Sequence, residues 1–204
     1  MARAARAGGL ALFAYLCWLM ALITWQYVPA RTDVAFLRIK TAALEQPYYA
    51  YAFFAHVFSS LAVLLAGAPQ FSTRLRARWP VLHRHLGRAY VALVLIVAAP
   101  TGLVMAAHAN GGWTAQASFG LQAVLWWGFT YQALATARRG DVPAHRRWMW
   151  RSYALTLSAL TLRLLKWGIV AAWAPPPMDT YRAVAWLGWA LNLALAETYL
   201  SRSA

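Results

Sequence analysis

The sequence predicts an all-α protein, a polytopic bundle of six transmembrane helices that forms one domain over residues 1–204. Hydrophobic residues make up 62% of the 204 positions and charged residues 12%, whereas ordinary soluble domains contain about 45–50% and about 25%. Six stretches of about 20 mostly apolar residues, the length that a bilayer span requires, are separated by short polar breaks. This composition excludes a disordered chain and a soluble enzyme of ordinary composition.

The six predicted spans cover most of the chain. The first stretch is longer than the apolar region of about 7–15 residues in a signal peptide, so we expect it to remain as a helix. Turn-forming dipeptides and prolines separate the later spans. Because the loops are short, we expect the function to lie within or across the bilayer. The predicted spans are residues 9–28, 48–68, 86–107, 115–137, 148–172 and 181–200.

The distribution of arginine predicts the orientation. Of the 19 Lys and Arg residues, 13 lie in the N-terminus, in the loops after the second and fourth spans, and in the C-terminal tail. Basic residues mark the cytoplasmic side, so we expect both termini in the cytoplasm and the chain in an inner membrane. The same distribution explains the net charge of +14 without nucleic acid as a partner. The single cysteine, Cys17, excludes an intramolecular disulfide framework.

Small residues at four-residue spacing predict close helix packing. On the third span they are Ala98, Gly102 and Ala106, with Pro100 expected to kink the helix between them. The sixth span carries a similar series from Gly188 to Ala196, with Asn192 between them.

Five histidines are the main candidates for chemistry. His56 lies inside the second span and His108 at the outer end of the third, while His83, His85 and His145 lie at cytoplasmic span entries. Histidines in both halves of an apolar helical bundle are typical of b-type haem proteins. We therefore expect His56 to pair with His108, and His85 with His145, as axial ligands. Two such haems could move electrons across the membrane to or from quinol or a redox partner protein.

Four basic residues could bind the haem propionates. Arg163 and Lys166 lie in the outer half of the fifth span, and Arg88 and Arg151 lie beside the inner histidine pair. Positive charge within a span needs a reason, so Arg163 is expected to bind an anionic ligand, a lipid headgroup or a carbonyl.

The depths of the outer histidines agree poorly. His56 follows Pro47 by nine residues and so lies roughly 13 Å deep. His108 lies near the outer surface, about 30 Å along the helix from Arg88. Pairing these histidines would require a displaced helix.

Other functions fit the same residues. A non-catalytic membrane subunit, a homo-oligomer or a small-molecule carrier could use its His and Arg clusters to bind lipid headgroups or a partner protein. Met105, His108 and His56 could instead bind copper, which suits thioether and imidazole ligands. Glu197 is the only acid within a span and is expected to pair with a cytoplasmic-side arginine. Without a second membrane carboxylate, a proton-relay transporter is disfavoured.

Two segments carry a family resemblance. They are His83-Arg84-His85-Leu86-Gly87-Arg88-Ala89-Tyr90 and His145-Arg146-Arg147-Trp148-Met149-Trp150-Arg151-Ser152-Tyr153. Over about residues 50–165 the chain resembles the predicted membrane proteins catalogued as domain of unknown function 2306. The resemblance implies a multi-span bacterial membrane protein and no known reaction. The two segments also resemble each other, which places His83 or His85 and His145 in equivalent positions. The six-span plan is similar in architecture to the di-haem cytochrome b561 proteins.

Overall fold

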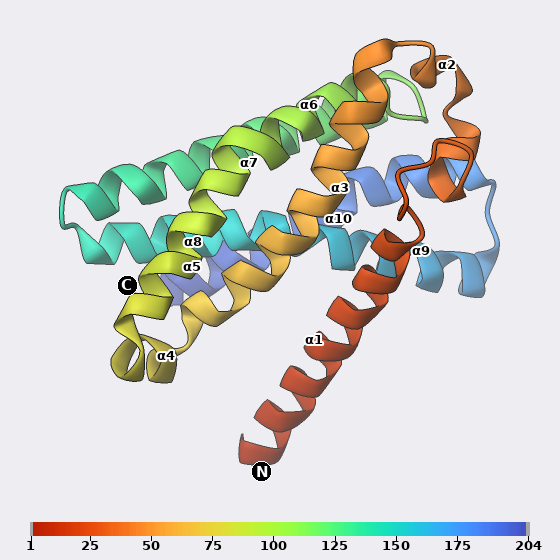
Figure 1. The fold of residues 1–204 in the computed structure, drawn as a ribbon. Helices are drawn as coiled ribbons and strands as arrows, with labels where there is room; N and C mark the ends of the chain where they lie inside the picture. Colours follow the sequence, from red (N-terminus) through yellow and green to blue (C-terminus); the bar gives the residue numbers. More distant parts are fainter. Residues whose placement is uncertain (1, 203–204) are drawn as a thin grey trace.

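Six long helical segments run back and forth between two ends of the molecule (Figure 1). The computed structural model describes residues 2–202, which contain no β-strand. The side chains of Arg3 and Arg6, both used in the charge count, lie outside the described residues. The long segments are α1 (Ala2–Trp25), α3 (Pro47–Gly67), α5 (Pro80–Ala92) continued by η3 (Leu93–Ala98) and α6 (Ala99–Ala107), α7 (Trp113–Arg138), α8 (Val142–Thr156) continued by α9 (Ser158–Trp173), and α10 (Pro177–Arg202). Short helices connect them: η1 (Ala35–Ile39), α2 (Thr41–Leu44), η2 (Ala68–Phe71) and α4 (Thr73–Arg78).

Four of these segments are long and apolar enough to cross a membrane. They are Ala7–Trp25, Pro47–Phe71, Pro80–Ala107 and Val142–Trp173. α7 and α10 have 26 residues each but carry more polar side chains. All six predicted ranges are helical apart from short ends, so the all-α prediction is confirmed.

We name the two ends of the bundle by their residues. The Pro47 end contains the start of α3 and the ends of α6 and α9, and the Arg-rich end contains α4, the end of α7 and the start of α8. At the Arg-rich end, two helices begin before the predicted spans. Pro80 starts α5, and the Asp141 carboxylate accepts a hydrogen bond of 3.0 Å from the Ala144 amide to cap α8. Hydropathy identifies only the apolar part of each helix.

A buried group of hydroxyls joins α5, α7 and α8. The Tyr90 hydroxyl lies 2.7 Å from Ser152 Oγ and 2.8 Å from Thr156 Oγ1. Thr130 Oγ1 lies 2.7 Å from Ser152 Oγ, and Trp126 Nε1 donates to Thr156 Oγ1 at 3.1 Å. A membrane interior offers no water to satisfy such groups, so they bond across helices. This network fixes the centre of the bundle.

Small residues let α10 approach α9 closely, as predicted. A Cβ at Gly188 would lie 2.9 Å from Cβ of Leu162. One turn along α10, Asn192 Oδ1 accepts a hydrogen bond of 2.9 Å from Thr161 Oγ1. In contrast, the N-terminal half of α1 stands apart from the other helices (Figure 1), and residues 7–12 are exposed. α1 contacts the bundle mainly through its C-terminal half.

Pro100 coincides with a change of hydrogen-bond register. In η3 the bonds are of the π type, and the Ala99 amide donates to Val94 O, five residues back. In the same five-residue pattern, the amide of residue 100 would donate to Leu95 O, but Pro100 has no N–H. The indole Nε1 of Trp127 on α7 donates to Leu95 O instead, at 3.1 Å. The irregular turn therefore presents carbonyl groups to neighbouring helices.

Candidate functional site

His56 lies on α3 against the irregular turn of the third span. Its Nδ1 is 2.8 Å from Ala98 O, and because a carbonyl only accepts, Nδ1 carries the hydrogen. A Cβ at Gly102 would lie 2.9 Å from His56 Cε1, so the ring fits only because residue 102 is glycine. Nε2 therefore keeps its lone pair, and within residues 2–202 it has no hydrogen-bond partner. The ring is held in place and one nitrogen remains an acceptor.

Ser60 follows His56 by one helical turn, on the same face of α3. Its Oγ is buried and forms no hydrogen bond to any described residue. An unpartnered hydroxyl in an apolar interior is costly. Two polar groups with unused hydrogen-bonding capacity therefore share one face of α3.

Arg163 on α9 brings a positive charge to the same region. On α3, Leu61 and Leu64 pack with Leu160 of α9, and Arg163 follows Leu160 by one turn. Arg163 is close enough to His56 to interact electrostatically. Its Nη1 donates to Ala159 O at 2.7 Å on its own helix, and none of the five Asp and Glu side chains, all within the described range, pairs with it.

We call His56, Ser60 and Arg163 the Arg163 site. A narrow groove between α1 and α9 leads to Arg163 and has about 10 Å³ of free space. Its other walls are apolar: Leu16, Leu19, Met20 and Ile23 of α1, and Leu160, Leu164 and Trp167 of α9. The groove thus ends at one cation, and α3 carries one hydroxyl and one nitrogen acceptor, Ser60 Oγ and His56 Nε2, on one face of its own helix. The site suits a ligand with an apolar body and an oxygen-bearing head.

His108 lies at the Pro47 end in a different environment. Its Nε2 is 3.1 Å from the Tyr48 hydroxyl, and its backbone O accepts a hydrogen bond of 2.5 Å from Lys40 Nζ. The same Nζ donates to Asn110 Oδ1 at 2.8 Å. Lys40 is only 4% exposed, and burial lowers the pKa of its ammonium to about 8. The segment between α1 and α3 is thereby tied to the end of α6.

The structure does not bring His56 and His108 to one level. The His56 ring touches Gly102, and His108 follows Gly102 by six residues, about 9 Å along a helix. This separation agrees with the depth difference that the sequence predicts. Met105, the third residue of the copper hypothesis, packs instead in an apolar cluster that includes Tyr49 and Phe53.

At the Arg-rich end, His83 rather than His85 lies near His145. His83 and His145 are close enough to interact electrostatically, whereas the His85 side chain is exposed. His145 Nδ1 donates to Ala133 O at 2.8 Å. With its amide oriented to satisfy its neighbours, Gln70 Nε2 donates to His83 Nδ1 at 3.1 Å. Residues 83 and 85 lie about 200° apart around the helix, so only one of them can face α8.

The other predicted propionate ligands lie apart from the Arg163 site. Lys166 and Arg88 are exposed on α9 and α5. Arg151 forms a two-pronged ion pair with Glu197, in which Nε lies 2.5 Å from Oε1 and Nη2 lies 2.8 Å from Oε2. The predicted pairing of Glu197 with an arginine is confirmed.

Among the described side chains, no group of three or more His, Cys, Asp or Glu residues could hold a metal ion. A bis-histidine haem needs only two ligands, so haem stays a prediction. His56 and His145 share one feature with metal-binding histidines, because in each the Nδ1 hydrogen is bound to a backbone carbonyl.

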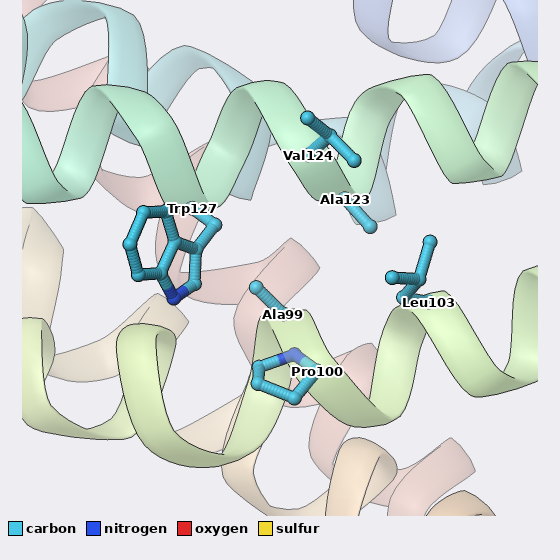
Figure 2. Close-up of a pocket in the computed structure, with 6 residues that line it drawn as sticks. All are labelled: Ala99, Pro100, Leu103, Ala123, Val124 and Trp127. Carbon is cyan, nitrogen blue, oxygen red and sulfur yellow. The ribbon is translucent and has the colours of Figure 1, made fainter.

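A larger groove of about 300 Å³ lies between α6 and α7 (Figure 2). Ala99, Pro100 and Leu103 face Ala123, Val124 and Trp127 across it. The only polar side-chain atom among these residues is Trp127 Nε1, which is already bonded to Leu95 O. This groove offers apolar contact and no chemistry.

Sequence reasoning identified His56 and Arg163 but missed two residues of their surroundings. Gly102 was recognised as a packing residue only, and Ser60 carried no motif. Ser60 could have been found from its spacing, because it follows His56 by four residues and so lies on the same helical face. That spacing points to a site only when α9 is known to pack against α3.

Comparison with curated proteins and with solved structures gives no significant match. The family model described as predicted membrane protein (DUF2306) matches residues 53–200. The match extends the resemblance predicted from the sequence through most of α10, and it includes all three residues of the Arg163 site. Because it covers more than half of the chain, the protein belongs to the DUF2306 family of predicted membrane proteins.

Proposed function

We propose that this protein binds a lipophilic ligand with an oxygen-bearing head at the Arg163 site. The observation that carries the proposal is the guanidinium of Arg163, which no carboxylate in the described part of the chain neutralises. A cation inside a membrane protein faces a pathway or a partner by default. Among the described residues, the Ser60 hydroxyl has no hydrogen-bond partner, and His56 adds an acceptor nitrogen, Nε2, that is not bonded either. A ligand head would satisfy all three groups.

The depth of the site favours a ligand that arrives from the bilayer. His56 lies nine residues into α3, roughly 13 Å from Pro47, which is near the middle of a hydrocarbon core about 30 Å thick. The groove between α1 and α9 has apolar walls and leads to Arg163. Because α1 is held only along part of its length, lateral entry between α1 and α9 needs little disruption of the bundle.

We also propose six spans in a bacterial inner membrane with both termini in the cytoplasm. The exposed arginines of α4, α5 and the α7–α8 turn gather at the Arg-rich end, as expected for a cytoplasmic face. The polar residues Ser118 and Thr130 of α7 are fully buried, so that its outer face, which includes Leu121 and Val124, suits lipid. Reporter proteins fused after residue 202 test the orientation. A GFP fusion should fluoresce, because GFP would lie in the cytoplasm. An active alkaline phosphatase fusion, which requires the periplasm, would contradict the orientation.

Haem-dependent electron transfer is a second candidate. It is favoured by the Nδ1-to-carbonyl bonds of His56 and His145, which leave Nε2 of each ring free to bind iron. His83 is the better partner for His145, and Arg163 would bind a propionate near His56. Absorption spectra of the purified protein, with haem added, test this candidate. A Soret band that is lost in His56→Ala or His145→Ala and kept in His85→Ala supports it, and no Soret band in the wild type contradicts it.

Mass spectrometry of the intact protein tests the ligand proposal. The protein is extracted in mild detergent, and any bound small molecule is identified by its mass. We expect a lipophilic species on the wild type and on Lys166→Met, which removes an exposed cation of the same helix. Arg163→Met should lose it. An equal amount of bound species on all three proteins would contradict the proposal.

A further inference from the structure

We infer that the ligand of the Arg163 site is a single-chain carboxylic acid, such as a long-chain fatty acid, and that it gives its proton to His56. This inference rests on the proposed ligand site and names the chemical class of the ligand. Its starting point is charge, because Arg163 stays protonated under all ordinary conditions and no residue from 2 to 202 supplies a counter-ion for it.

The donors in the site match a carboxylate. Arg163 uses one N–H for Ala159 O and keeps its other N–H groups for a ligand. Paired N–H groups of a guanidinium bind the two oxygens of a carboxylate side by side. The Ser60 hydroxyl can donate a further hydrogen bond to the same head.

His56 can accept a proton from an acid that enters the site in its neutral form. Its Nδ1 hydrogen is bound to Ala98 O, so Nε2 can only accept. A neutral carboxylic acid crosses the hydrocarbon core more readily than its anion. In the site, its O–H bond breaks and an Nε2–H bond forms, which leaves a carboxylate between two cations, Arg163 and the imidazolium of His56. The total charge is unchanged by this transfer.

Few other groups compete for this proton. The irregular turn and α6 present Ala98 and Gly102 to His56, and α9 presents Arg163. Tyr27, beyond the end of α1, is close enough to Arg163 to interact electrostatically. Among residues 2–202, no carboxylate pairs with either cation, so the ligand supplies the negative charge.

The groove selects against bulkier lipids. It is narrow, and its walls are flexible aliphatic side chains, including Met20, together with Trp167. One alkyl chain can be seated by rotating such side chains, because methionine adapts readily to new packing. A phospholipid would have to bring a second chain and a strongly hydrated phosphate to mid-membrane depth.

Titration of the purified protein with hexadecanoic acid, hexadecanol and a short-tailed quinol tests the inference. We expect the acid to bind at least tenfold more tightly than the alcohol, and Arg163→Met to weaken acid binding at least tenfold. Lys166→Met should change it less than twofold. Binding of the alcohol or the quinol equal to or tighter than that of the acid would overturn the inference but leave the ligand site standing. Failure of all three probes to bind would contradict the ligand site as well.

The position of the proton is tested separately with hexadecanoic acid labelled with ¹³C at the carboxyl carbon. Its NMR shift should report a carboxylate on the wild type and a protonated acid on His56→Ala, in which the base is missing. The unfolding temperature of each variant, compared with that of Lys166→Met, verifies that it is folded. A protonated acid on the wild type would overturn the proton transfer.

Discussion

The imidazole of His56 rests against Gly102, and a Cβ at that position would come within 2.9 Å of its Cε1 and 3.1 Å of its Nδ1. The contact sets the ring where Nδ1 meets Ala98 O at 2.8 Å. One glycine on α6 therefore makes room for the ring position in which Nδ1 is bound and Nε2 is left as an acceptor.

Replacement of Gly102 should weaken ligand binding, although residue 102 is not itself part of the Arg163 site. In Gly102→Ala the new methyl group displaces the ring, because a separation under 3.0 Å is not tolerated. We expect hexadecanoic acid to bind about tenfold more weakly, equivalent to about 1.4 kcal/mol. Gly128→Ala is the matched control, since a Cβ there meets nothing within 4 Å. Equal affinities for the two variants would show that Gly102 does not position His56.

The buried hydroxyl network should contribute strongly to stability. Tyr90→Phe removes the hydroxyl that lies between Ser152 and Thr156, and with it two hydrogen bonds of the buried core. We expect a loss of about 1–3 kcal/mol in the free energy of unfolding, measured by equilibrium denaturation in mixed micelles. Tyr131→Phe removes an exposed hydroxyl from α7 and should change stability by less than about 0.5 kcal/mol. Similar losses in both variants would contradict the role of the network.

Trp127 and Pro100 should be energetically coupled. Trp127→Phe removes the N–H that satisfies Leu95 O, and we expect it to cost about 1–2 kcal/mol, close to the value of one hydrogen bond. In a Pro100→Ala background the new backbone N–H can take over this carbonyl, so Trp127→Phe should then cost less. A double-mutant cycle measures the difference. Additive effects would mean that the proline does not create the need for the indole.

Lys40 should make stability depend on pH in the alkaline range. Its pKa is lowered by burial from 10.5 to about 8, so between these values the unfolded chain binds more protons at this residue than the folded chain does. The free energy of unfolding therefore rises with pH, by up to about 1.4 kcal/mol per unit. Melting curves from pH 8 to pH 10 should show this rise in the wild type and a smaller one in Lys40→Met. Parallel curves would contradict it.

Hydropathy and charge predict the helices of this chain well, because both are properties of short segments. The starts of α5 and α8 extend beyond the predicted spans, since Pro80 and Asp141 begin helices in polar sequence that hydropathy does not detect. The π-type turn before Pro100 was not predicted beyond a kink, because its register depends on hydrogen bonds with α3 and α7.

The site can be predicted from the sequence only in part, because contacts between distant segments bring its residues together. Arg163 is visible as a charge within a span, and His56 as an ionisable residue at depth. Their proximity is set by the packing of Leu160 against Leu64, which joins segments about 100 residues apart. Likewise, sequence spacing cannot decide whether His83 or His85 faces His145.

Photo-crosslinking with a hexadecanoic acid that carries a photoreactive group in its chain tests the central claim most directly. Labelled peptides, identified by mass spectrometry, report which groove holds the chain. We expect labels on α1 around Met20 and on α9 around Leu164, and their loss in Arg163→Met but not in Lys166→Met. Labels confined to the groove of Leu103 and Trp127 between α6 and α7, or labelling of α1 and α9 that persists in Arg163→Met, would contradict the claim that Arg163 holds the ligand.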